Sequence, residues 1–181
     1  MINSGLINGI PVHADRYLLT NLLRDELGFD GIILTDWEDI NKLHDRDKVA
    51  ESRKEAIKIA INAGIDMSMI PYDYEEFCDN LLELVKEGEI SETRIDESVR
   101  RILKLKIELG LFDKKNKPDY IDFGSQKHQN YAYDAAVESM TLLKNVNSTL
   151  PIKNKNKILV TGPNGDSMRT LNGAWTYSWQ G

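Results

Sequence analysis

The chain has little that could link it covalently or hold it in a membrane. It contains one cysteine, Cys78, in 181 residues, so no internal disulfide can form. Cys78 falls among apolar residues on an expected helix, and we predict a buried structural thiol. No apolar run approaches transmembrane length, and no signal-peptide pattern follows Met1. The chain is long enough for one substantial core, or for part of one domain and the start of another.

An excess of positive charge is also missing. The net charge is −6, and no stripe of Lys and Arg follows any expected helix, which argues against a nucleic-acid surface. Short basic runs at 114–117 and 153–157 are interpreted as solvated loops. Hydrophobic and charged contents of 41% and 29% are ordinary for a soluble globular protein. The sequence shows neither low-complexity segments nor repeats beyond its strand–helix alternation.

The first two thirds of the chain alternate between helical and extended patterns. A short, continuous apolar run at Ile32, Ile33 and Leu34 predicts a parallel strand covered on both faces. Gly28 just before it is typical of a helix end. This alternation predicts an α/β fold with parallel strands. The expected elements are a helix over 15–27, strands at 32–36 and 65–70, and helices over 49–63, 74–87 and 91–109.

Apolar residues at helical spacing predict which faces are buried. The first helix has the stripe Leu18, Leu19, Leu22, Leu23 and Leu27. The helix that follows Ser91 has the stripe Ile95, Val99, Ile102, Leu103 and Leu109. The helix from Tyr74 has the stripe Phe77, Leu81, Leu84 and Val85.

A second domain is expected to begin after a linker. Residues 113–125 are charged, contain Pro118 and Gly124, and have no periodicity. A helix is expected over 126–143, with extended pieces at 150–152 and 157–161. The last residues, 173–181, are aromatic and nothing follows to cover them, so we expect a truncated domain. Trp175 and Trp179 there are interpreted as packing residues.

The predicted strand at 32–36 ends in a carboxylate followed by an indole, Asp36 and Trp37. Ligands and catalytic groups gather at the carboxyl ends of parallel strands in α/β proteins. An acid beside a flat aromatic ring able to stack on a sugar is a candidate site. The alternative is that Asp36 only caps a turn and Trp37 only packs.

Two other polar segments invite a ligand. The segment 38–48 is rich in acids and contains His44, but it lacks the spacing of an EF-hand loop, and neither His44 nor His13 has metal-site spacing. We therefore expect a solvated, irregular loop and no metal. The turn at 161–167 follows an expected strand but matches no phosphate-binding motif, and Pro163 removes a backbone donor. A nucleotide-binding domain built on that turn stays an alternative.

Several motifs in order along the chain resemble glycoside hydrolase family 3. Gly28-Phe29-Asp30-Gly31 followed by an apolar strand and Thr35-Asp36-Trp37 resembles the family's nucleophile segment. Other segments are similar to family landmarks in the same order, and together they cover nearly the whole chain: Ile7-Asn8-Gly9-Ile10-Pro11, Tyr17 to Arg24, Ala63-Gly64-Ile65-Asp66-Met67, Leu142-Leu143-Lys144-Asn145 and Gly162-Pro163-Asn164.

The resemblance implies the architecture. Residues 1–112 would be the last βα units of a (β/α)₈ barrel, which needs about 250 residues when complete. Residues 113–125 would be the linker, and residues 126–181 the truncated start of an α/β sandwich domain.

The resemblance also implies the chemistry: a retaining, exo-acting β-glucosidase acting on β-glucosides or oligosaccharides, with Asp36 as nucleophile and Trp37 on the sugar. The acid/base would lie beyond residue 181; Glu38 and Asp39 are too near Asp36 in sequence to oppose it. The isolated chain is therefore expected to be inactive. No cofactor or metal is expected. The alternatives are a β-xylosidase of the same family, or a non-catalytic carbohydrate-binding or interaction module with Asp36 structural. Oligomeric state stays open, and a periplasmic or secreted location is expected from intact family members.

Overall fold

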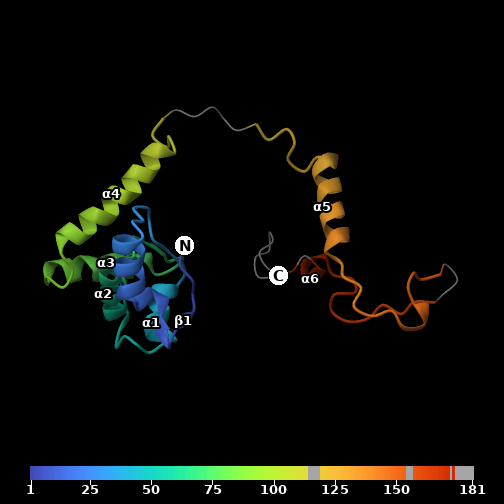
Figure 1. Cartoon of the computed structure of the whole chain (residues 1–181), viewed down its shortest axis with the longest axis horizontal. Coiled ribbons are helices and arrows are strands. Elements are labelled where there is room, and N and C mark those ends of the chain that lie inside the picture. Colours follow the sequence, from blue (N-terminus) through green and yellow to red (C-terminus); the bar gives the residue numbers. More distant parts are fainter. Residues whose placement is uncertain (114–118, 154–156, 172, 174–181) are drawn as a thin grey trace. The chain divides into compact units, whose positions relative to one another are not determined.

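The computed structural model describes residues 1–113, 119–153, 157–171 and 173. It divides the chain into two compact units, Met1–Lys117 (unit 1) and Pro118–Gly181 (unit 2), whose elements are labelled in Figure 1. Part of the expected linker, residues 114–118, and the tryptophans Trp175 and Trp179 lie outside the described residues.

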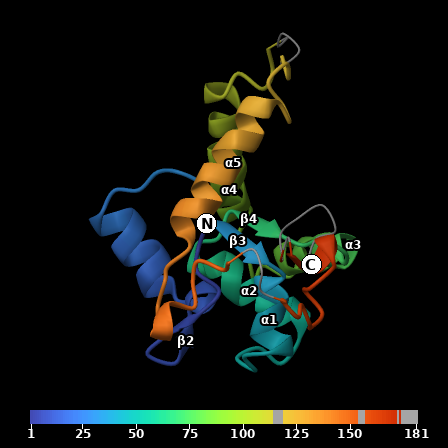
Figure 2. The same cartoon turned by 90° about the vertical axis from the view of Figure 1, so that its right-hand side faces the viewer.

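The centre of unit 1 is a pair of parallel strands. Strand β3 (Leu34–Trp37) pairs with β4 (Met67–Met69), with Leu34 opposite Met67 and Trp37 opposite Met69; Figure 2 shows the two side by side. The parallel pairing confirms the α/β class. Strand β3 begins two residues later than predicted and includes Asp36 and Trp37.

A third extended segment lies on the other edge of β3. The Ile2 N–H donates to the Leu34 carbonyl over 2.9 Å, while the carbonyl of Ile33 accepts from the β4 side. Successive carbonyls in extended chain point to opposite edges. Residues around Ile2 therefore flank β3 on the edge that β4 leaves free.

Helix α2 (Arg53–Ala63) packs against helices α1 (Asp39–Asp45) and α3 (Tyr74–Lys86). The prediction of an irregular loop over 38–48 was wrong, because Ile40 and Leu43, three residues apart and fully buried, give α1 a core face. Among the most buried side chains of unit 1 are Ile33, Ile40, Leu43, Ala56, Ile57, Ala60, Ile65 and Ile90.

Serine side chains set where two helices begin. Ser52 Oγ accepts from the Glu55 N–H over 3.1 Å, so α2 begins at Arg53 and not at the predicted residue 49. Ser91 Oγ accepts from the Arg94 N–H over 3.2 Å at the start of α4 (Glu92–Glu108), as the sequence predicted.

The amino-terminal part of unit 1 begins with a short hairpin of β1 (Leu6–Ile7) and β2 (Ile10–Pro11), which precedes the first helix that the sequence predicts. The hairpin turns at Asn8 and Gly9, which both have positive φ (51° and 82°). An Asn-Gly pair between apolar residues is the usual signal of such a turn.

A short 3₁₀ helix, η1 (Val12–Ala14), follows the hairpin, and then comes η2 (Tyr17–Glu26). Helix η2 is a π-helix, and just after it the Leu27 N–H bonds the Leu22 carbonyl five residues back. Of the predicted stripe only Leu19 is fully buried, and Leu27 is exposed. Gly28 ends the element with φ +69°, as expected.

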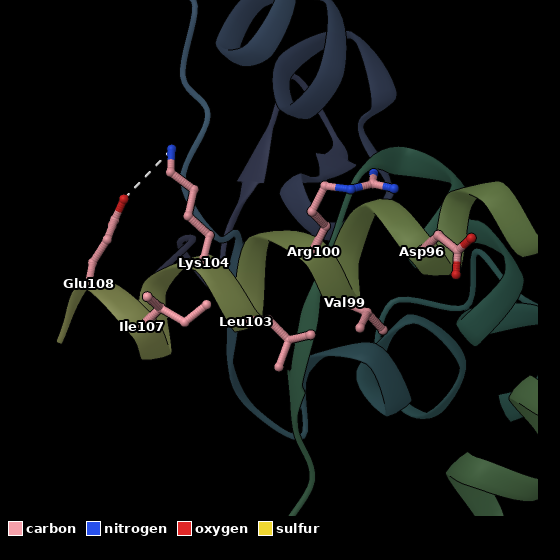
Figure 3. Close-up of a pocket in the computed structure, with 7 residues that line it drawn as sticks. All are labelled: Asp96, Val99, Arg100, Leu103, Lys104, Ile107 and Glu108. Atoms are coloured by element: carbon pink, nitrogen blue, oxygen red, sulfur yellow. Dashed lines mark ion pairs between the residues drawn. The ribbon is translucent and has the colours of Figure 1, made fainter. Parts of the chain in front are cut away.

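Two predictions about buried side chains were wrong. Val99 and Leu103 of α4, and Leu109 just after it, are 44–55% exposed, because no described residue covers that face. Val99 and Leu103 line an open hollow along the helix with Ile107 (Figure 3). Cys78 is exposed on α3, because it lies on the side of that helix away from Leu84.

Unit 2 contains helix α5 (Gln126–Ser139), a 3₁₀ turn η3 (Val146–Ser148) and the short helix α6 (Met168–Leu171). The strands expected at 150–152 and 157–161 do not form, since a strand needs a partner and no described residue of this unit pairs with them. None of the described side chains in unit 2 is buried. In the described parts of the chain, no helix has the length and apolar character needed to cross a bilayer.

Candidate active site

The site predicted from the sequence lies at the carboxyl end of β3. Thr35 is fully buried, and its hydroxyl accepts from the Met69 N–H over 2.8 Å, which ties β3 to β4. Between the pairs Leu34–Met67 and Trp37–Met69, β3 contains one residue more than β4, so Thr35 and Asp36 lie in a β-bulge. Asp36 is half-buried there. Asp36 thus lies at an irregular step of the strand, where bulges re-aim side chains.

The contacts of Asp36 are few. Its Oδ1 accepts from the N–H of its own neighbour, Trp37, over 2.7 Å. The start of α1 has no side-chain cap, so Asp36 does not cap that helix. Among the described side chains Asp36 has no ion-pair partner.

An aromatic pair stands beside the acid. Trp37 is half-buried and meets the ring of Tyr72 edge to face, with centroids 6.2 Å apart and planes at 83°. Tyr72 is 69% exposed and follows β4. The sequence analysis missed Tyr72, although its place just after the second strand was the available signal. The pair forms an apolar wall at the same end of the strands as Asp36.

A single residue turns the chain from β3 into α1. Glu38 has a left-handed backbone, φ +62°, and its N–H donates to the Met69 carbonyl over 3.0 Å. A non-glycine residue in this region is strained and needs support from its surroundings. The Glu38 carboxylate accepts from Asn41 Nδ2 over 2.9 Å. This turn places Asp39 at the first position of α1, three residues after Asp36.

Asp39 is not the solvated loop acid that the sequence predicted. It is 2% exposed, and its Oδ1 accepts from Ser4 Oγ over 2.6 Å and from Lys42 Nζ over 2.7 Å. Its Oδ2 lies 3.1 Å from Nε2 of His13, which is also 2% exposed. Neither His13 Nε2 nor Asp39 Oδ2 has a well-aligned hydrogen-bond partner.

Burial governs the protonation of His13. Removal from water lowers the pKa of His13 below its usual value of 6.5, against the opposing effect of the Asp39 carboxylate. Lys42 and Arg46 lower the pKa further, while Asp36 raises it. His13 is therefore neutral near pH 7 and lies within electrostatic reach of Asp36.

At the amino end of β4, Asp66 has a different environment. It accepts from Arg24 over 2.5 Å, from Arg101 over 2.9 Å, and from the Ser98 hydroxyl over 2.7 Å. It also accepts from the Ile33 N–H over 2.9 Å. Burial alone would raise the pKa of Asp66, but these donors and guanidinium groups hold it below its usual range.

The other polar segments show no second site. Among the described residues, no group of three or more His, Cys, Asp and Glu side chains is arranged to hold a metal ion. In the 161–167 turn the Gly165 N–H donates to the Gly162 carbonyl over 3.1 Å, so one backbone donor is used within the turn.

These features define an α/β protein with an acidic and aromatic site at the carboxyl end of its parallel strands. The chain belongs to glycoside hydrolase family 3, because the model of the Glycosyl hydrolase family 3 N terminal domain matches residues 2–105. The resemblance seen in the sequence is thereby confirmed, and the relatives are glycoside hydrolases.

Two curated relatives illustrate the range of the family. The lysosomal beta glucosidase of Dictyostelium discoideum is 46% identical over all of this chain and 23% of its own length. A putative beta-xylosidase of Formosa agariphila is 40% identical over 90% of this chain and 22% of its own length. The chain thus spans less than a quarter of the length of these relatives.

A solved structure agrees with the fold. The exo-1,3/1,4-beta-glucanase of a Pseudoalteromonas species is 37% identical, with a TM-score of 0.74, over 96% of this chain and 22% of that chain. The likeness supports the α/β class.

Proposed function

We propose that the intact protein is a retaining, exo-acting β-glycosidase that removes terminal, non-reducing β-D-glucosyl residues, with Asp36 as the nucleophile. The observation that carries the proposal is the placement of Asp36 at the carboxyl end of β3, with no cation paired to it among the described residues. An uncompensated carboxylate held on a strand is suited to attack an anomeric carbon.

The reaction would take two steps. Asp36 attacks the anomeric carbon while an acid protonates the leaving oxygen, giving a covalent glycosyl-enzyme. Water, deprotonated by the same acid/base group, then attacks the anomeric carbon and releases Asp36. The two carboxyl groups of a retaining enzyme stand about 5–5.5 Å apart on opposite sides of the bond. We place the acid/base outside these 181 residues and therefore expect the chain by itself to be inactive.

Trp37 would supply an apolar face for the sugar, with Tyr72 supporting the ring from its edge. The edge-to-face contact at 6.2 Å fixes the plane of the indole. A fixed aromatic plane beside the nucleophile would orient the ring of a β-glucoside for attack.

We also propose a division of the chain into domains. Residues 1–112 would be the final βα units of the barrel, with Ile2 at the end of the preceding strand, beside β3. Residues 113–125 would be the linker and 126–181 the start of the sandwich domain. In this assignment Asp36 lies on the catalytic face of the barrel.

A β-xylosidase is the second candidate, because the Formosa relative is a putative beta-xylosidase at 40% identity. Comparing kcat/KM for aryl β-glucoside and aryl β-xyloside on the intact protein decides between the two. A carbohydrate-binding module with a structural Asp36 is the non-catalytic alternative.

The test is to trap the intact protein with a 2-deoxy-2-fluoro-glucoside and to map the labelled peptide by mass spectrometry. The label is expected on the peptide containing Asp36. Asp36→Asn should give no label and lower hydrolysis by about 1000-fold or more. A matched control is Asp45→Asn, which changes an exposed carboxylate on the next helix and should retain activity. A label on another carboxylate refutes the assignment of Asp36, and absence of both labelling and hydrolysis favours the binding module.

A further inference from the structure

Near the candidate nucleophile the structure holds a polar cluster, buried at His13 and Asp39 and half-buried at Ser4 and Lys42, that the proposed reaction does not use. It consists of Ser4, His13, Asp39 and Lys42, and we call it the Asp39 cluster. Asp39 is the first residue of α1, three positions after Asp36, and Glu38 with its left-handed backbone lies between them. Contacts that hold Asp39 in place therefore also restrict the backbone conformation just after Asp36.

The cluster connects three separate segments. Ser4 donates to Asp39 from the segment before the hairpin, and the Ser4 carbonyl accepts from Arg46 Nη2 over 2.9 Å. His13 approaches Asp39 from η1. Lys42 donates from the next turn of α1. Asp39 is thus held from the amino-terminal segment as well as from its own helix.

The two oxygens of Asp39 differ in their partners. Oδ1 accepts two hydrogen bonds, whereas Oδ2 faces only His13 Nε2 at 3.1 Å. A buried acceptor with no donor destabilises the folded state. A small rotation of the imidazole that aligns Nε2–H with Oδ2 would satisfy both atoms at once. This requires the tautomer of neutral His13 that carries its proton on Nε2.

The contact of His13 with Asp39 lies next to a strained residue, Glu38, whose backbone needs support. A left-handed, non-glycine residue is strained, and it persists only where neighbouring contacts hold it. The Glu38 N–H is bound on one side to the Met69 carbonyl. On the carboxyl-terminal side of Glu38, the chain is held by the contacts of Asp39 with Ser4, Lys42 and His13.

We propose that His13 and Asp39 are positioning residues, and that the Nε2–H···Oδ2 contact holds the Glu38 turn so that Asp36 meets the anomeric carbon in line. This inference rests on the proposed function, because it assigns the two residues to the geometry of the Asp36 attack. Neither residue touches the sugar. Their loss should slow the attack while leaving substrate binding nearly unchanged.

The experiment measures the rate of labelling of the intact protein by the 2-deoxy-2-fluoro-glucoside, separately from the binding constant of that reagent. His13→Met keeps the volume of the side chain but removes the donor, and should slow labelling by about 10- to 100-fold with binding changed by less than about threefold. His13→Gln places an amide donor near the original Nε2 and should stay within about threefold of the wild-type rate.

The rescue by glutamine separates positioning from packing. If His13 only fills the core, His13→Met should label as fast as the wild type, and that result overturns the inference. Equal loss in the Gln and Met variants would also overturn it, because the donor would then not matter. Asp45→Asn, on the exposed side of the same helix, is the matched control and should label at the wild-type rate.

A milder variant covers the case in which His13→Met fails to fold. Ser4→Ala removes one donor to Asp39 Oδ1 and is expected to slow labelling about three- to tenfold, with unchanged binding. An unchanged rate in Ser4→Ala would then overturn the inference. The wild-type label itself tests the proposed function: without a label on the Asp36 peptide the proposed function fails, whereas a correct label with insensitive variants refutes only the positioning role.

Discussion

Asp39 and Asp66 are both buried carboxylates of unit 1, yet they lie at opposite ends of the parallel strand pair and have opposite surroundings. Asp66 precedes β4 and is bonded to two guanidinium groups, a hydroxyl and a backbone N–H. Asp39 follows β3, and one of its oxygens has no aligned donor. Both oxygens of Asp66 accept hydrogen bonds, whereas only Oδ1 of Asp39 does.

The same difference is found in parallel α/β folds, in which one end of the strands contributes to stability and the other end carries the functional site. A saturated carboxylate has no remaining capacity for a ligand. An acid such as Asp36, with one hydrogen bond from its own neighbour, keeps that capacity. Polar groups left incompletely bonded are therefore expected at the functional end.

The largest effect on stability should come from removing the charge of Asp66. Asp66→Asn leaves the guanidinium groups of Arg24 and Arg101 without their buried counter-charge and should lower the free energy of unfolding by about 3–5 kcal/mol. Urea unfolding of the intact protein, followed by tryptophan fluorescence, measures the loss. Glu97→Gln is the control, because the Glu97 side chain is 45% exposed and its Oε2 lies 3.8 Å from Arg101 Nη2. A loss no larger than that of the control would contradict the structural role of Asp66.

A smaller effect should appear in the pH dependence of stability at the other end. The folded-state pKa of His13 is lowered, so the unfolded chain binds its proton first and stability is lost as pH falls from about 6.5 through the folded value. The groups that act on His13 are Asp39, Lys42, Arg46 and Asp36. Melting curves between about pH 8 and pH 5 should show a steeper decline for the wild type than for His13→Gln. Parallel declines would mean that His13 does not titrate in this range.

The smallest effect on stability is expected away from both ends of the strand pair, at an exposed ion pair. Lys104 Nζ contacts Asp30 Oδ2 at 2.6 Å, but the two side chains are 53% and 81% exposed. Solvent screens such a pair, so Lys104→Gln should change the melting temperature of the intact protein by about 1 °C or less. A drop of several degrees would show that Lys104 on α4 contributes to a contact with another part of the protein.

Local patterns predicted much of unit 1 because they report on short-range physics. The cap at Ser91, the glycine at 28 and the parallel strand pair follow from capping, left-handed backbone and burial on both faces. The start of α1 was missed because its two apolar residues, Ile40 and Leu43, are separated by polar ones and look like a loop in isolation. Asp36 and Trp37 were singled out from the sequence, and their catalytic roles stay a prediction.

The sequence by itself determined the family, the parallel strand pair and the residues at the carboxyl end of β3, because these depend on motifs and spacings within a few residues. Only the tertiary structure decided which charges are buried. Asp39 meets Ser4, 35 residues away, and Asp66 meets Arg24 and Arg101, 42 and 35 residues away. Burial and pairing over such separations depend on how the strands and helices pack, which no local pattern encodes.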